Sequence, residues 1–167
     1  MAHRDRGRIL QNFGMEIRRV QADKWRELRD IRLRALSDAP DAFETRHEEA
    51  VQRPDDWWID WAARSAEGDR QAMFLAWESD GPVGIVGTFI EEGRCSLISM
   101  WTDPSVRGRG IGAALVEAAV DFACSARSTE LFLEVRLHNE PARRLFERCG
   151  FIDTGAGVEE REMKRVL

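Results

Sequence analysis

The first third of the chain carries apolar residues at helical spacing. Over about 23–36, four of them recur every three or four positions: Trp25, Leu28, Ile31 and Ala35. This period is typical of an amphipathic helix that buries one side. A second helix is predicted after Pro54, where aspartates occupy a first turn whose positive dipole end favours them. A short strand is predicted over 15–20, before both helices.

Further along, the pattern changes from helical to extended. Three apolar runs are separated by two short turns that contain glycine, with the runs at 73–77, 83–90 and 95–101 and the turns at 79–81 and 91–93. Turns this short join antiparallel neighbours. This part of the chain therefore predicts a three-stranded antiparallel meander.

In the last third of the chain, segments with helical spacing of apolar residues alternate with segments of extended pattern. Gly150 stands where a residue in the left-handed conformation commonly ends a helix. The predicted elements are a helix over 110–125, a strand over 131–135, a helix over 141–149, a strand from 151 and a strand over 160–166. The whole order is β-α-α-β-β-β-α-β-α-β-β, which indicates a mixed α/β (α+β mixed sheet) fold.

The length of 167 residues favours one domain with a real hydrophobic core. Residues 1–14 are polar and rich in arginine, so we expect a flexible N-terminal tail there and a single domain over 15–167. No apolar run approaches the roughly 20 residues that a membrane helix needs, so no membrane partner is expected.

The charge of the chain narrows the classes of partner. A formal net charge of −5 argues against a nucleic-acid partner, which would favour a basic face, and suits a cationic acceptor. Arginine supplies almost all the positive charge, which we interpret as the codon bias of a GC-rich bacterial genome.

The cysteines and histidines are few and scattered. Cys95, Cys124 and Cys149 form no C-x-x-C pair, and we expect them to be reduced thiols in a cytoplasmic protein. The three histidines are equally dispersed, so no metal is expected.

The most informative segment is the glycine-rich and arginine-rich stretch over 100–113, which joins a predicted strand to a predicted helix. Glycines let backbone N–H groups approach an anion closely, and the helix N-terminus adds further donors. A phosphate or pyrophosphate ligand is the natural occupant of such a loop.

Three alternatives compete for this loop. A Walker A site needs a lysine that the segment lacks. Gly108, Gly110 and Ala113 fit the Rossmann G-x-G-x-x-[GA] spacing, but a meander precedes them and too few residues follow for a dinucleotide fold. An ordinary structural turn is the third alternative.

A more specific match combines two motifs. Residues 107–112 (RGRGIG) fit the pattern [QR]-x-x-G-x-[GA], and they follow Asp103-Pro104. Further along, residues 133–139 (LEVRLHN) and 142–151 (ARRLFERCGF) are similar to a second pattern, L-E-V-x-x-x-N followed by A-x-x-L-Y-E-x-x-G-F. In these motifs and in element order over about 15–167 the chain resembles the GCN5-related N-acetyltransferase (GNAT) family. The resemblance implies the GNAT acyl-CoA N-acyltransferase fold and an acetyltransferase that uses acetyl-CoA as acyl donor.

The resemblance also implies where acetyl-CoA binds. Backbone groups of Met100, Trp101 and Thr102 would pair with the pantetheine arm. Amides of the loop and the first helical turn would hold the pyrophosphate: Gly108, Arg109, Gly110, Ile111, Gly112 and Ala113. Arg107 and Arg109 would add charge, although ordinary surface placement is an equal alternative. Asn139 would face the cofactor arm, or cap the helix that follows, or do both.

Glu134 is the candidate general base. An amine of pKa near 10.4 must lose a proton before it attacks, and a carboxylate can take that proton directly or through water. The resemblance puts Glu134 on the strand where some family members hold a base, and strand alternation puts it opposite Leu131, Leu133 and Val135. The alternative is a solvated or ion-paired glutamate.

One position departs from the family pattern. Phe146 stands where the family usually has a tyrosine proposed to protonate the CoA thiolate, and the chain contains no tyrosine. Water, Ser99, Thr102 or Cys149 are the alternative proton donors. The gap keeps a second hypothesis open, a non-catalytic acyl-CoA-binding sensor or partner domain of the same fold.

The acceptor site is expected from the two early helices and the loop between them. Its candidate residues are Phe43, Glu44, Trp57, Trp58 and Trp61. Aromatic rings with carboxylates suit a cation, and core packing of an amphipathic helix is the alternative for Trp58 and Trp61. The expected acceptor is a primary amine of a small molecule or of a protein N-terminus, attacked in a ternary complex. The sequence leaves a homodimer open.

Overall fold

The computed structural model of the protein describes residues 8–10 and 14–167. In this part of the chain the strands form one eight-stranded sheet, in the order β1-β2-β3-β4-β5-β6-β8-β7. The strands are β1 (Arg8–Leu10), β2 (Met15–Arg19), β3 (Gln71–Glu78), β4 (Gly81–Glu91), β5 (Arg94–Thr102), β6 (Glu130–Arg136), β7 (Ile152–Asp153) and β8 (Glu160–Val166). The helices are α1 (Trp25–Asp38), α2 (His47–Val51), α3 (Asp55–Ala66), α4 (Ile111–Ser125) and α5 (Glu140–Arg148).

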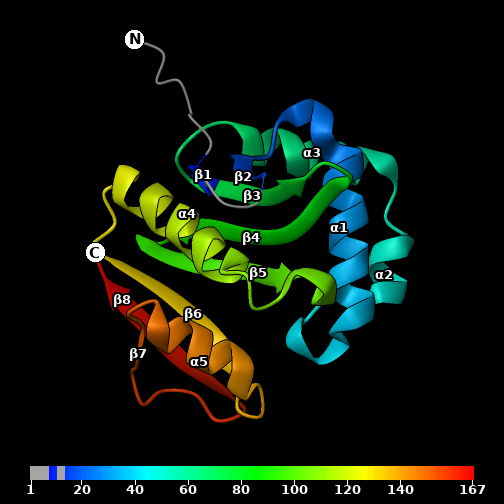
Figure 1. The fold of residues 1–167 in the computed structure, drawn as a ribbon. Coiled ribbons are helices and arrows are strands. Elements are labelled where there is room, and N and C mark those ends of the chain that lie inside the picture. Colours follow the sequence, from blue (N-terminus) through cyan, green and yellow to red (C-terminus); the bar gives the residue numbers. More distant parts are fainter. Residues whose placement is uncertain (1–7, 11–13) are drawn as a thin grey trace.

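Helices cover both faces of the sheet (Figure 1). α4 packs on one face of the central strands, while α1 and α3 pack on the other. Neighbouring residues of one strand point to opposite faces, so Leu75 enters the core under α1 and Ala76 the core under α4. Full burial of a leucine or isoleucine contributes about 1.5–3 kcal/mol, so both cores stabilise the sheet.

The strands from β1 to β5 are all antiparallel to their neighbours. β5 and β6 are parallel, because α4 returns the chain to the same end of the sheet before β6 begins. β8 then pairs antiparallel with β6 along its whole length, from Glu130 opposite Val166 to Arg136 opposite Glu160. The only parallel contact among the described strands is therefore the one between β5 and β6.

The element order expected over 15–167 and the mixed α/β fold are confirmed, with two additions. The five-residue α2 was not predicted, because so short a helix shows no usable period. Residues 8–10, expected to be part of a flexible tail, form β1 and pair with β2. The rest of the expected tail, at 1–7 and 11–13, lies outside the described residues.

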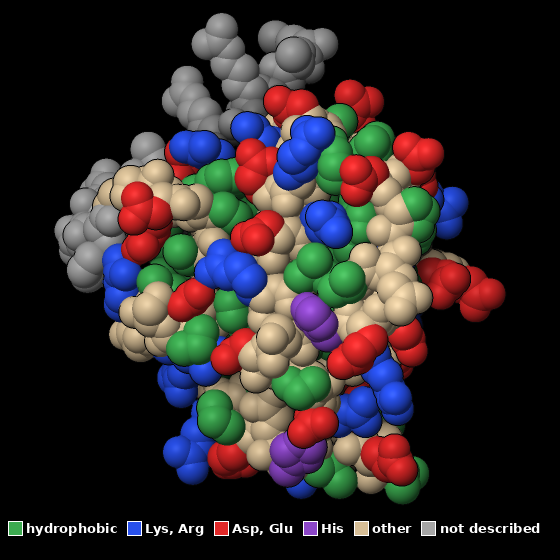
Figure 2. Space-filling model, turned by 90° about the vertical axis from the view of Figure 1, so that its right-hand side faces the viewer, with side chains coloured by type: hydrophobic (Ala, Val, Ile, Leu, Met, Phe, Trp, Pro, Cys, Tyr) green, Lys and Arg blue, Asp and Glu red, His purple; other side chains and the backbone are tan. Residues whose placement is uncertain are grey.

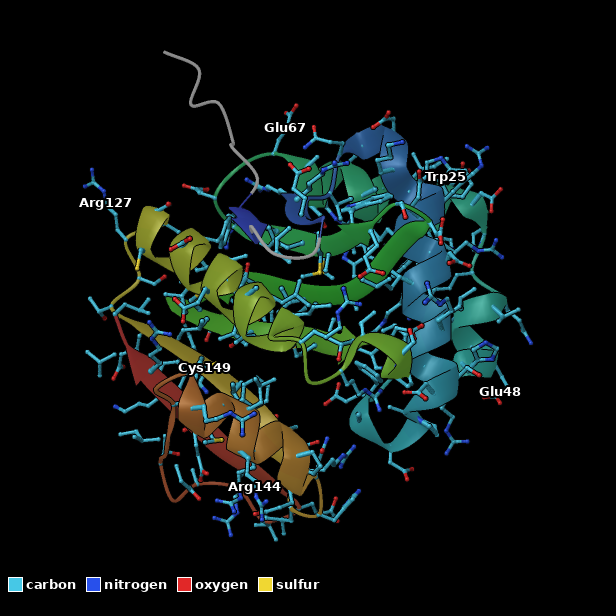
Figure 3. All side chains as sticks on the ribbon, viewed as in Figure 1. Trp25, Glu48, Glu67, Arg127, Arg144 and Cys149 are labelled. Atoms are coloured by element: carbon cyan, nitrogen blue, oxygen red, sulfur yellow. The ribbon has the colours of Figure 1, made fainter. Side chains whose placement is uncertain are left out.

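Charged side chains of both signs lie over the face formed by α1 and α2 (Figure 2). Figure 3 shows Glu48 of α2 and Cys149, just after α5, on opposite sides of the molecule. In the described part of the chain, no helix is both long and apolar enough to cross a bilayer.

Candidate active site

The sheet splits between β5 and β6. These two strands are in register only at Cys95 opposite Leu131 and Ser96 opposite Phe132, near the start of each strand. Beyond Ser96 the strands diverge, so β5 has no strand partner on this side within the described residues. Backbone N–H and C=O groups here need another partner, and an extended ligand can supply it.

A bulge marks β5 beside this split. Ile85 of β4 faces Trp101 whereas Gly87 faces Ile98, so β5 carries one extra residue over this stretch. Ser99 lies in the bulge with a φ of 57°, in the left-handed region that non-glycine residues seldom occupy. Strained backbone of this kind often marks a functional site.

The glycine loop leads from the split to the N-terminus of α4. Gly108 and Gly110 have φ values of 78° and 82°, and a Cβ on either would meet nothing within 4 Å. Gly110 is also the residue that precedes the first turn of α4. The first N–H groups of a helix lack partners within the helix, so this open loop fits an anionic group such as pyrophosphate.

Gly112 is required for a different reason. A Cβ at this position would lie 3.0 Å from Cδ2 of Leu145 in α5 and 3.4 Å from Cε of Met100. The small residue therefore lets α5 and β5 approach the first turn of α4 closely. Gly110 therefore lies in an open loop, whereas Gly112 lies where the side chains of Leu145 and Met100 pack against α4.

The two arginines of the loop are both ion-paired. Arg107 binds Asp38, at the end of α1, with 2.7 Å between Nη2 and Oδ2, and its Nε donates to the carbonyl of Thr102. Arg109 binds Glu78 of β3 at 2.7 Å. These pairs connect the loop to the end of α1 and to the end of β3. Any charge that the arginines add to a bound anion acts from these positions.

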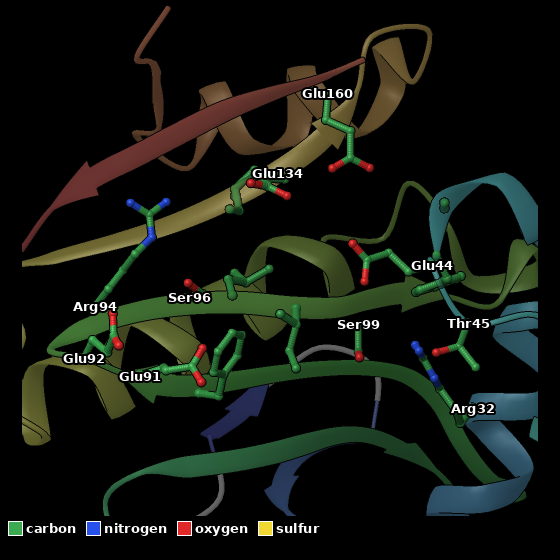
Figure 4. Close-up of a pocket in the computed structure, with 16 residues that line it drawn as sticks. Arg32, Glu44, Thr45, Glu91, Glu92, Arg94, Ser96, Ser99, Glu134 and Glu160 are labelled. Atoms are coloured by element: carbon green, nitrogen blue, oxygen red, sulfur yellow. The ribbon is translucent and has the colours of Figure 1, made fainter. Parts of the chain in front are cut away.

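A cavity of about 780 Å³ opens on the side of the split that faces α1. Its walls come from α1, the segment over 42–45, the facing ends of β4 and β5, and β6 and β8. Figure 4 shows Glu134 and Glu160 along one wall, Ser96 and Ser99 on β5, and Glu44 with Arg32 toward the other end. The volume is typical of a small-molecule site.

Glu134 points into this cavity from β6. Leu131, Leu133 and Val135 are buried while Glu134 is exposed, as strand alternation predicts. Its pKa is raised above the usual value, first by a hydrogen bond shared with Glu160 and then by partial burial. The negative charges of Glu160, Glu162 and Glu44 act in the same direction. A carboxylate with a raised pKa is a stronger base.

The neighbours of Glu134 come from the cross-strand register of β6 and β8. Glu162 is directly opposite Glu134, and Glu160 is opposite Arg136, with 3.0 Å between Arg136 Nε and Glu160 Oε1. A smaller cavity of about 350 Å³ continues past these residues toward 156–159. Several carboxylates thus lie near Glu134 in this smaller cavity, with Arg136 among them.

Phe146 and Asn139 lie on α5 and at its start. Phe146 is buried and meets Phe151 edge-on, with 5.8 Å between ring centroids. The 780 Å³ cavity does not include it among its described lining residues. Asn139 caps α5, since its Oδ1 accepts from the N–H of Ala142 at 3.3 Å.

The expected acceptor residues separate into two groups. Phe43 and Glu44 line the cavity. Trp57, Trp58 and Trp61 do not appear among its described lining residues and instead form a mutual aromatic cluster with centroid distances of 4.9–5.8 Å. Trp58 is fully buried against α1 and α2, which agrees with core packing.

Sequence reasoning missed several cavity residues. Arg32 comes from α1, Arg94 and Ser96 from β5, and Glu160 from β8, and these residues share no motif. A usable signal existed only for Glu160, because its predicted strand carries alternating charges at 160 and 162. Arg32 reaches the β5 residues only through the packing of α1 on the sheet.

The comparisons with known proteins agree with this geometry. A model of the acetyltransferase (GNAT) family matches residues 25–151. Mycothiol acetyltransferase of Clavibacter michiganensis is 31% identical over 94 residues, which cover 56% of this chain and 31% of that protein. The ribosomal protein bS18-alanine N-acetyltransferase of Escherichia coli is 28% identical over 94 residues, 56% of this chain and 64% of that protein.

A crystal structure of PaiA N-acetyltransferase from Thermoplasma acidophilum, in complex with coenzyme A, superposes with a TM-score of 0.78. It is 16% identical and the match covers 92% of this chain and 99% of that one, which shows the shared fold. The fold is thus that of the acyl-CoA N-acyltransferases. From the family match over 25–151, the chain belongs to the GNAT acetyltransferase family. It spans less than two thirds of the curated relatives named above.

Proposed function

We propose that this chain is an acetyl-CoA-dependent N-acetyltransferase that acetylates a primary amine of a small molecule or a protein N-terminus by direct attack in a ternary complex. The observation that carries the proposal is Glu134, a carboxylate of raised pKa in a cavity beside the split of β5 and β6. Family membership supports the same activity.

The described residues fit acetyl-CoA as the acyl donor. The free edge of β5 at Met100, Trp101 and Thr102 suits an extended arm, and the open loop at Gly108 and Gly110 suits a pyrophosphate. Amides of residues 108–113 are the proposed donors, and we propose that Asn139, at the start of α5, faces the cofactor arm. Acetyl-CoA supplies an acetyl group on a thioester and leaves as CoA thiol. We propose that no metal takes part.

Glu134 has one task in this mechanism. The incoming amine is mostly protonated at neutral pH, and only the free amine has a lone pair for attack. Glu134 takes the ammonium proton directly or through one water, and the other acidic groups of the cavity attract the cation beforehand. General base catalysis of this kind contributes about 10²–10⁴-fold.

The lack of a hydroxyl on Phe146 favours a second candidate function. The residue offers no proton for a departing thiolate, and a chain that only senses acyl-CoA would need none. Against this, a thiol of pKa near 8.5 leaves acceptably as an anion. We propose Ser99 as the hydroxyl for this role, because its backbone lies in the bulge of β5 and the residue lines the cavity.

The cellular setting is also part of the proposal. We propose a bacterial, cytoplasmic enzyme with residues 15–167 acting as one acetyltransferase domain, with neither nucleic acid nor membrane as partner. The described cysteines Cys95, Cys124 and Cys149 are free thiols, and the relatives named above include bacterial enzymes. A homodimer is a further proposal, which sedimentation velocity tests directly.

The experiment measures amine-dependent release of CoA thiol, with mass-spectrometric identification of N-acetylated products from a panel of amines. Glu134→Gln should lower kcat/KM about 10²-fold or more near neutral pH and recover toward high pH, where free amine is plentiful. Glu130→Gln on the same strand is the matched control, since it lies outside both cavities.

A pH–rate profile unchanged by Glu134→Gln would remove this residue from the mechanism. Acetyl-CoA binding without amine-dependent release would instead establish the sensor function.

A further inference from the structure

The cavity contains two guanidinium groups in very different settings. Arg94 is neutralised, because its Nη2 lies 2.6 Å from Oε2 of Glu162 and its guanidinium stacks 3.7 Å from the Phe132 ring centroid. Arg32 stacks on Phe43 at 4.6 Å but pairs with no carboxylate among the described residues. Its Nη1 atom is buried and has no hydrogen-bond partner there.

Arg32 nevertheless stays charged. Burial lowers its pKa to about 10, and the like charge of Arg53 acts in the same direction. A pKa near 10 leaves the guanidinium protonated at neutral pH. A buried charge without a counter-charge is costly, so an anionic group that enters the cavity gains an unusually favourable contact.

The nearest acidic residues do not remove this charge. Glu44 lines the same cavity on the Arg32 side, but no ion pair joins it to Arg32 among the described residues. Figure 4 shows Arg32 on the α1 side and Glu134 on the β6 side, with Ser99 and Thr45 toward the Arg32 end. The α1 side of the cavity therefore carries a guanidinium that has no ion-pair partner among the described residues, and the β6 side carries Glu134 and Glu160.

We propose that the acceptor is a small zwitterion of the amino-acid type, whose carboxylate binds Arg32 while its amine faces Glu134. This inference rests on the proposed function and names its substrate class. A carboxylate matches the planar fork of a guanidinium, which can donate two parallel hydrogen bonds. A dianionic phosphate fits less well, because Glu44, Glu134 and Glu160 would repel its second charge.

The assignment also explains why the cavity carries an arginine at all. An amine that lacks a carboxylate would be repelled by Arg32, and it would bind more tightly if this position held a neutral residue. In a zwitterion the carboxylate is attracted by Arg32 and the amine by Glu134. The reversed orientation is disfavoured, because it would bring like charges together at both residues. The hydroxyls of Thr45 and Ser99, which line the cavity, are further donors for the carboxylate.

The test compares matched acceptors, each free amino acid with its own carboxamide, in the same CoA-release assay. The wild-type protein should prefer the amino acid by at least tenfold in kcat/KM. Arg32→Met should abolish that preference by raising KM for the amino acid about tenfold or more, with little change for the carboxamide. Arg32→Lys, which keeps the charge but loses the fork, should retain part of the preference.

Two further measurements separate the possible failures. Acetyl-CoA affinity by calorimetry should be the same in wild type and Arg32→Met, and the melting temperature of Arg32→Met should not fall, because an unpaired charge has been removed. Equal turnover of both members of each pair by wild type, or an unchanged preference in Arg32→Met, overturns the zwitterion assignment alone. Absence of CoA release with every amine overturns the proposed function instead.

Discussion

The indole Nε1 of Trp101 donates a hydrogen bond of 2.9 Å to Oδ2 of Asp38, which joins the free end of β5 to the last residue of α1. The same oxygen accepts from Arg107 of the glycine loop. One carboxylate thus connects three elements that border the cleft. Asp38 lies at the negative end of the α1 dipole, where a carboxylate is unfavourable without such partners.

Asp38→Asn should destabilise the fold near pH 7. The hydrogen bond from Trp101, followed by Arg107, lowers the pKa of Asp38, so its stabilising contribution is present above the ordinary pKa of an aspartate and is lost as the pH falls through the lowered value. Because the group is partly exposed and screened, we expect a loss of about 1 kcal/mol. Urea denaturation at pH 7 and at pH 3 measures this loss of free energy of unfolding.

Asp80→Asn, in the exposed turn before β4, is the control. A difference between wild type and Asp38→Asn that persists unchanged at the lower pH would contradict the ionic explanation.

Gly110→Asp should weaken acetyl-CoA binding more than Gly110→Asn. Both replacements tolerate a positive φ comparatively well, both can cap a helix, and neither meets an atom within 4 Å at Cβ, so they differ chiefly in charge. A carboxylate beside the pyrophosphate should reduce affinity about tenfold relative to asparagine, or about 1.4 kcal/mol. Isothermal calorimetry is the measurement. Equal affinities for the two variants would show that the loop does not hold the phosphates.

Glu160→Gln should move the acidic limb of the pH–rate profile to lower pH. The hydrogen bond with Glu160 is the main cause of the raised pKa of Glu134, so its replacement by an amide, which can donate to the ionised carboxylate, lowers that pKa. The base is then ionised at lower pH. Because the pKa of Glu134 is raised in the folded state, the free energy of unfolding of the wild type should fall as the pH rises above the ordinary pKa of a glutamate. In Glu160→Gln this fall should be absent. Glu48→Gln, on the exposed part of α2, removes the same charge at a residue that is not among the described lining of either cavity, and it should leave the profile in place.

Phe146→Tyr tests the missing acid. If the new hydroxyl reaches the leaving sulfur, kcat should rise about fivefold, equivalent to about 1 kcal/mol, and the rate should depend less on the thiol pKa of a graded series of acyl donors. If the hydroxyl stays buried beside Phe151 without a partner, the melting temperature should fall instead. The Ser99→Ala variant is the companion measurement. A shallow thiol dependence in wild type that steepens in Ser99→Ala would assign the proton to Ser99 and refute the account of Phe146 as a gap.

The sequence by itself determined most of the elements and the donor loop. Helical spacing over 23–36 and alternation around Glu134 are local patterns, so they identified α1 and the exposed face of β6 without any knowledge of their partners. Glycines at 108 and 110 likewise have a local cause, because their positive φ is a property of the loop itself.

The tertiary structure alone decided which charges meet. Arg32 and Glu134 are about a hundred positions apart and come to one cavity only through the packing of α1 on the sheet. The raised pKa of Glu134 depends on the register of β6 with β8, and the ion pairs of Arg107 and Arg109 depend on α1 and β3. The spacing of the tryptophans is compatible with a binding wall and with a core, and the full burial of Trp58 against α1 and α2 supports core packing for that residue. A local pattern fixes the direction of a side chain within its element, whereas its electrostatic environment is the sum over residues brought together by folding.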